Sequence, residues 1–182
     1  MHSDIAVVLQ SKGNSMKSNE LLLDTFGRIR ETVEATLNGL DDGSLVRRPA
    51  GTGNSIAWLI WHLGRVEDAQ VASAASLDQV WKSQDFAGRF GLPLTDRDTG
   101  YGHSSRQVDA VRARPELLLE YYDAVHRQTV GFLETLTDAD LDRIVDRRWD
   151  PPVTLGVRLV STIADCLQHV GQAAYVKGLN AG

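Results

Sequence analysis

The segment 56–66, which reads IAWLIWHLGRV, is apolar around nearly its whole circumference if it is helical, and it constrains the fold more than any other segment. A surface helix needs only one apolar face, so a helix that is apolar on all sides must be surrounded by other elements. Asn54 and Ser55, both favoured N-cap residues, precede it. We therefore predict a central, buried helix that begins near residue 56 and ends near residue 75.

Three further long helices are predicted around this central one. Residues 20–40 carry apolar side chains at spacings of three and four, the period of one helix face, and Asp41–Gly43 end the run. Another helix begins at Pro115, a residue favoured in a first turn, and the last covers 155–179. The polar, glycine-rich segment 81–114 joins the second helix to the third, and loops of this length are usually functional. The predicted fold is all-α, a four-helix bundle with a long crossover between helices two and three.

The connections and the N-terminus complete the predicted organisation. Residues 138–144 are expected to form a short acidic helix, and WDPPVT at 149–154 must be extended because its prolines lack amide donors and restrict their neighbours. Residues 1–18 are expected to be a loose N-terminal extension, in which Met16 is an alternative start. Residues 19–182 then form a single bundle domain, a length that can bury one substantial core.

Composition excludes several classes of protein. The net charge of −5 and the lack of a clustered basic patch argue against a nucleic-acid surface. No apolar run approaches the 18 residues of a membrane span. The single cysteine, Cys166, excludes an intrachain disulfide and fits a reducing, cytoplasmic location.

Three side chains are candidate ligands for a divalent metal. His62 lies on the central helix, and Asp165 and His169 lie four residues apart on the last helix. Side chains at i and i+4 project from the same helix face, about 5–6 Å apart. Two imidazoles and a carboxylate leave one coordination position open on zinc, as catalytic sites require. Bundle proteins build such sites from side chains on facing helices.

The same residues also have ordinary structural interpretations. A buried histidine such as His62 is often bonded to a backbone carbonyl or another core side chain. Periodicity alone places Asp165 and His169 on a solvated polar face, nearly opposite the apolar stripe of the last helix. That stripe is expected to consist of Ile163, Leu167, Val170 and Ala174. The pattern leaves both interpretations open.

Other residues near these candidates are given roles as well. Gln172, one turn beyond His169, is expected to orient a ligand or bound water, the alternative being a solvated helix residue. His103, in the stretch TGYGHS, is expected to act as a substrate-binding or proton-relay group, the alternative being an exposed loop histidine. Cys166 is expected to be a small buried residue, because a neighbouring carboxylate raises a thiol pKa and disfavours a nucleophile.

Four motifs stand in order along the chain and together carry a resemblance to a known family. They are NSIAWLIWHL around His62, DTGYGHS at 98–104, WDPPVTLGVRL at 149–159 and the D-x-x-x-H-x-G-Q string at 165–172. The chain resembles the DinB/YfiT-like superfamily of metal-binding four-helix bundles and is most similar to its mycothiol-dependent branch. In this resemblance His62 and His169 match the family's first and last histidine ligands. Asp165 holds the middle position, where members carry histidine or glutamate, and Val170 replaces an arginine.

The resemblance implies an enzyme that binds a divalent metal, zinc with nickel as second candidate. It implies a metal-dependent thiol S-transferase, in which mycothiol is the thiol co-substrate and its sulfur attacks an electrophile in a detoxifying conjugation. The partners are thus a small-molecule thiol and an electrophile, with no nucleic acid and no membrane. Two alternatives stay open: a non-catalytic, stress-associated dimeric bundle stabilised by metal, and a hydrolase that uses metal-bound hydroxide. A homodimer is expected, because segment 56–66 has more apolar surface than three neighbouring helices easily hide.

Overall fold

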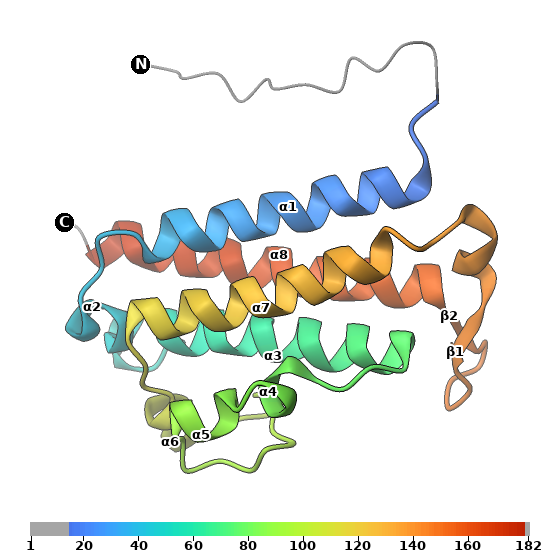
Figure 1. Cartoon of the computed structure of the whole chain (residues 1–182). Coiled ribbons are helices and arrows are strands. Elements are labelled where there is room, and N and C mark those ends of the chain that lie inside the picture. The colour runs from blue at the N-terminus through green and yellow to red at the C-terminus, as the bar shows by residue number, and fades with distance from the viewer. Residues whose placement is uncertain (1–14, 181–182) are drawn as a thin grey trace.

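The computed structural model describes residues 15–180 and contains four long helices that pack side by side (Figure 1). The long helices are α1 (Ser18–Leu37), α3 (Ile56–Ala75), α7 (Pro115–Leu133) and α8 (Leu155–Asn180). The predicted all-α four-helix bundle is therefore confirmed. Most of the predicted N-terminal extension, residues 1–14, lies outside the described residues. None of the helices within 15–180 is both long and apolar enough to cross a membrane.

Short elements connect the four long helices. They are α2 (Asp42–Val46), η1 (Pro49–Gly51), α4 (Val80–Ser83), α5 (Phe86–Phe90), α6 (Ser105–Ala110), η2 (Asp138–Asp142), β1 (Ile144–Asp146) and β2 (Val153–Thr154). The crossover between α3 and α7 thus contains three short helices, which the prediction of a loop missed. The extended segment predicted around the prolines includes β2, which pairs antiparallel with β1, with Ile144 opposite Thr154.

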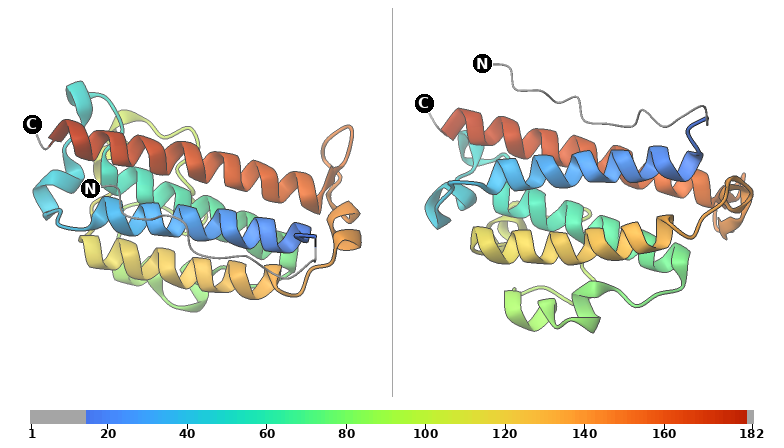
Figure 2. Two further views of the ribbon diagram at one scale, coloured as in Figure 1. Left: turned by 90° about the horizontal axis from the view of Figure 1, so that it is seen from above. Right: turned by 45° about the horizontal axis from the view of Figure 1, so that its top comes forward.

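Helix α3 is the central helix of the bundle, as its sequence predicts. Fifteen of its residues are buried, and it packs against both α7 and α8. The crossover covers a further side, because α4 to α6 lie on the side of the bundle opposite α1 (Figures 1 and 2). Trp81 and Phe86 of this crossover are buried and place their rings about 5 Å from the ring of Tyr121 on α7. The apolar surface of α3 is therefore covered within one chain, and it no longer argues for a dimer.

The apolar stripe of α8 differs from the predicted one. Its buried residues are Leu155, Leu159, Thr162, Cys166, Val170, Ala173 and Val176. The predicted stripe was wrong at Leu167, which is 45% exposed, and at Ala174, which is also exposed. The reason is that Thr162, a polar residue, bonds its hydroxyl to the Arg158 carbonyl and is therefore buried. Cys166 is buried beside it, as expected from the sequence. The true stripe is rotated, and Asp165 flanks it.

Candidate metal centre

The structure brings His62, Asp165 and His169 together between α3 and α8. Asp165 Oδ1 lies 3.9 Å from His62 Nε2, and Asp165 Oδ2 lies 3.8 Å from His169 Nε2. One potential ligand atom from each side chain lies within 4.8 Å of the other two. A tetrahedral ion with bonds of about 2.1 Å holds its ligand atoms roughly 3.4 Å apart, so small side-chain movements would complete a site.

Both histidines are oriented so that Nε2 faces Asp165. His62 Nδ1 is hydrogen-bonded to the carbonyl oxygen of Thr99, so this nitrogen carries the proton and donates it. His169 Nδ1 lies 3.2 Å from Gln172 Oε1 and donates in the same way. A histidine that donates through Nδ1 presents a lone pair on Nε2, which is how histidine ligands are held for metals. Gln172 is thus placed where the sequence predicts an orienting residue.

The electrostatics of the cluster suit a cation. Asp165 Oδ1 is buried and has no hydrogen-bond partner among the described residues. An unpartnered buried carboxylate oxygen is costly, and a bound cation would compensate for it. Burial lowers the pKa of His62, against the opposing effect of its bond to Thr99, and the neighbouring His169 lowers this pKa further. His62 is therefore neutral at physiological pH, which is the form that binds a metal.

The cluster has a buried side and an accessible side. The side chain of His62 is only 6% exposed, whereas that of Asp165 is 36% exposed. Trp58 covers His62, with their rings nearly parallel and 4.6 Å apart at the centroids. The cluster is therefore most accessible at Asp165, and His169 is also partly exposed, at 19%.

His103 lies beside the cluster but is not part of it. Its Nδ1 accepts a 3.0 Å hydrogen bond from Trp58 Nε1, and its Nε2 donates over 2.7 Å to Asp98 Oδ1. The side chain is 2% exposed, so the alternative of an exposed loop histidine is wrong. Both ring nitrogens of His103 are already hydrogen-bonded. This geometry is typical of a residue that holds Trp58 in position, and it does not favour a proton relay.

Gly100 allows the crossover to approach His62 closely. Its φ angle is +95°, and a Cβ atom there would lie 2.6 Å from His62 Nδ1 and 3.1 Å from the ring of Trp58. A side chain would therefore disturb both the metal-facing histidine and the aromatic ring that covers it.

Comparisons with known proteins agree with this architecture. The family model described as the DinB superfamily matches residues 25–173, which include the three clustered side chains. The chain belongs to the DinB superfamily. A crystal structure of a conserved protein from Enterococcus faecalis is similar to it, with a TM-score of 0.85 and 34% identity over 92% of this chain and 99% of that one. A comparison with curated proteins found no match.

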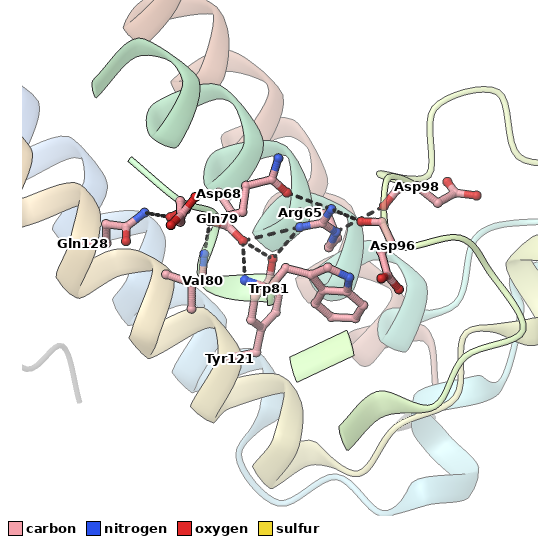
Figure 3. Close-up of polar contacts among 10 residues, drawn as sticks. Arg65, Asp68, Gln79, Val80, Trp81, Asp96, Asp98, Tyr121 and Gln128 are labelled. Atoms are coloured by element: carbon pink, nitrogen blue, oxygen red, sulfur yellow. Dashed lines mark hydrogen bonds and ion pairs between the residues drawn. The ribbon is translucent and has the colours of Figure 1, made fainter. Parts of the chain in front are cut away.

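In this member of the DinB superfamily, a buried arginine fixes the part of the crossover that contacts His62. Arg65 is fully buried on α3 and donates to the carbonyl oxygens of Asp98, at 3.1 Å, and Asp96, at 3.2 Å (Figure 3). It also donates to Gln79 Oε1 at the start of the crossover. Thr99 directly follows Asp98, so Arg65 indirectly holds the carbonyl that orients His62.

Asp68, one turn further along α3, fixes the beginning of the same crossover. Its carboxylate accepts 2.8 Å hydrogen bonds from the backbone amides of Val80 and Trp81, and it also bonds the Tyr121 hydroxyl (Figure 3). Arg65 lies 3.4 Å away and partly balances its charge. Sequence reasoning missed this pair, although charged residues of opposite sign inside a largely apolar helix are a signal of buried pairing.

Proposed function

We propose that this protein is a metal-dependent thiol S-transferase, with a divalent metal held by His62, Asp165 and His169. Zinc is the first candidate and nickel the second, since two imidazoles and a carboxylate suit both. The observation that carries the proposal is the arrangement of two Nε2 atoms around a carboxylate whose buried oxygen has no hydrogen-bond partner within residues 15–180. Mycothiol is the proposed thiol, on the strength of the sequence resemblance, and the reaction would take place in the cytoplasm.

The reaction joins a small thiol to an electrophile. A divalent ion held by His62, Asp165 and His169 would favour release of the thiol proton to the solvent at neutral pH. The sulfur then forms a bond to the electrophilic carbon, and the leaving group departs with its electron pair. His62 and His169 hold their orientation through Thr99 and Gln172.

The protein itself offers no suitable nucleophile at this place. Cys166 is fully buried, and burial raises the pKa of its thiol well above the usual value, with Glu67 and Asp165 adding to the effect. Its sulfur contacts the carbonyl oxygen of Leu63 and does not belong to the cluster of potential ligands. An external thiol is therefore required, and Cys166→Ser should keep activity.

A purely structural metal site is less well supported. Structural zinc sites are closed by four protein ligands, whereas the cluster found within residues 15–180 has three members. Cys166 and His103 are the nearest candidates for a fourth. Cys166 is buried against α3, and His103 already uses both ring nitrogens.

The proposal is tested by measuring conjugation of a neutral electrophile, monochlorobimane, by zinc- and nickel-loaded protein. Mycothiol, glutathione and cysteine are compared as thiols, and His62→Ala is compared with the exposed-residue control Gln168→Ala. We expect turnover that requires a thiol, is highest with mycothiol, and is lost only in His62→Ala. Hydrolysis of an ester without added thiol would instead support the metal-hydroxide alternative. Bound metal without either activity would support the structural one.

A further inference from the structure

A small, arginine-rich cavity lies where the β1–β2 hairpin meets α3 and α8. Its volume is about 190 Å³, and its floor includes Gln70 and Ser73 of α3. Arg147 and Arg148 of the hairpin and Arg158 of α8 line it together with one acidic residue, Asp146. The residues that line this small volume thus include three arginines and one aspartate, an excess of two positive charges.

Asp146 holds two of the arginines in place without neutralising the cluster. Its carboxylate accepts bonds of 3.0 and 2.8 Å from Arg148 and one of 2.9 Å from Arg158. Arg158 is fixed further by a 2.7 Å hydrogen bond to Gln70 Oε1. Arg147 is exposed, and no hydrogen bond or ion pair of its side chain occurs within the described residues. The third guanidinium is thus free to bind an added anion.

The cavity and the metal centre both lie along the interface between α3 and α8. Helices α3 and α8 run antiparallel, so Gln70 faces Arg158 as His62 faces Asp165. The eight residues from His62 to Gln70 correspond to about 12 Å along the helix axis. Val66, which lies between them on the same face, is half-buried.

Asp165 of the metal centre and Arg158 of the cavity lie on the same face of α8. Asp165 is the most exposed of the three candidate ligands, and Arg158 lies seven residues earlier, about two turns away on the same face of α8. A single extended molecule approaching along α8 could therefore contact both places.

We infer that this cavity is a subsite for a carboxylate or phosphate group of the molecule that reacts at the metal centre. Guanidinium groups bind planar, charged oxygen groups through paired hydrogen bonds, and a prearranged arginine loses little freedom on binding. The subsite itself rests on the cavity and its arginines. Its link to a reacting molecule rests on the proposed transferase function. The substrate class is therefore an anionic thiol or an anionic electrophile, with its charge about 12 Å from the reacting atom.

The subsite is tested by titrating the full chain with inorganic phosphate and with succinate at constant ionic strength, using NMR of arginine Nε–H and backbone amide groups. We expect saturable shifts centred on residues 146–149. The variant Arg147→Gln/Arg148→Gln should weaken binding at least fivefold. Its matched control is Arg112→Gln/Arg127→Gln, which removes two exposed arginines that do not line the cavity and should bind as the parent does. Equal weakening in both variants, or shifts that do not saturate, would overturn the subsite.

Steady-state kinetics then identify which molecule carries the anion. As thiol, 8-mercaptooctanoate is compared with neutral 8-mercapto-1-octanol, and as electrophile 8-(2-chloroacetamido)octanoate is compared with neutral N-octyl-2-chloroacetamide, because these chains are long enough to separate the carboxylate from the reacting atom by the required span. The hairpin variant should raise KM about tenfold for the anionic member of one pair and leave both neutral compounds unchanged. Unchanged KM for both anionic compounds would overturn the link to the reaction. Phosphate binding without turnover by the parent protein in any combination would refute the transferase function and retain the subsite.

Discussion

His62 donates its Nδ1 proton to the carbonyl oxygen of Thr99, a residue 37 positions later in the chain. The ligand on the central helix is therefore oriented by the crossover and not by its own helix. His169 obtains the same orientation from Gln172 on its own helix. The two imidazoles of the candidate centre thus depend on different parts of the fold, and substitutions can separate their contributions.

Loss of either histidine should remove the metal. We expect His62→Ala and His169→Ala each to reduce bound zinc from roughly one ion per chain to a trace, because two protein ligands do not hold a site of this kind. Metal content after dialysis, measured by mass spectrometry, checks this. Gln168→Ala is the control, since Gln168 is exposed on α8 between Asp165 and His169. Full metal content in both histidine variants would refute the assignment.

Gln172→Ala should weaken zinc binding by about tenfold without unfolding the protein. Residues that orient a ligand histidine typically contribute 10- to 100-fold in metal affinity. Gln172 is exposed, so its loss should leave the thermal unfolding temperature of the metal-free protein unchanged. Competition with a zinc chelator measures the affinity. Gln172→Glu, which keeps an oxygen acceptor, should restore most of it, and a failure to do so would contradict the orienting role.

Gly100→Ala should destabilise the protein more than Gly102→Ala. Both glycines have positive φ angles, +95° and +72°, so each substitution carries a similar backbone penalty of about 1 kcal/mol. Only at Gly100 would the added Cβ meet His62 and the tryptophan rings, and we expect about 1–3 kcal/mol more there. Urea denaturation gives the two free energies of unfolding. Equal losses of free energy of unfolding in the two variants would show that the crossover backbone can move away from His62 at little cost.

Stability should decrease as pH rises from about 4.5 to about 7. Glu67 is fully buried, and burial raises its pKa from 4.5 to about 7, although Tyr122 and Thr129 donate hydrogen bonds to it. The unfolded chain releases this proton at lower pH than the folded chain, so the folded state loses stability through this interval. The shift corresponds to roughly 3 kcal/mol. The free energy of unfolding, measured with urea, should be larger at pH 5 than at pH 8 in the parent protein but not in Glu67→Gln. If the variant keeps the same difference, groups other than Glu67 cause it.

A homodimer through the outer face of α8 remains our expectation for assembly. Val157, Val160 and Leu167 are 54%, 61% and 45% exposed, and with Ala164 they follow the three-four spacing of a helix-pairing seam. Leu167→Glu should give a monomer by light scattering. Leu21→Glu, at a similarly exposed site on α1, should not. A parent protein that is monomeric throughout the micromolar range would exclude the dimer.

The sequence predicted the four long helices because their apolar periods are long and their boundaries carry capping residues or glycine. It also placed His62, Asp165 and His169 among the candidates, since two of them are four residues apart and the third is polar in an apolar helix. The predicted buried face of α8 was wrong because Thr162 is polar by residue type but is buried, with its hydroxyl bonded to the Arg158 carbonyl. The role of Arg65 was missed because its partners are backbone carbonyls of the crossover, whose positions no residue pattern reveals.

The crossover is attached to α3 at two separate places, by Asp68 at its start and by Arg65 at residues 96 and 98. Between these attachments Phe86 and Phe90 are buried against Tyr121, so it is the interval of residues 91–95 that can be lengthened, shortened or replaced while Thr99 stays at its distance from His62. Natural variants of this protein should show most of their insertions and deletions in that interval. Evolution can in this way change the surface of the crossover without rebuilding the ligands that the crossover orients.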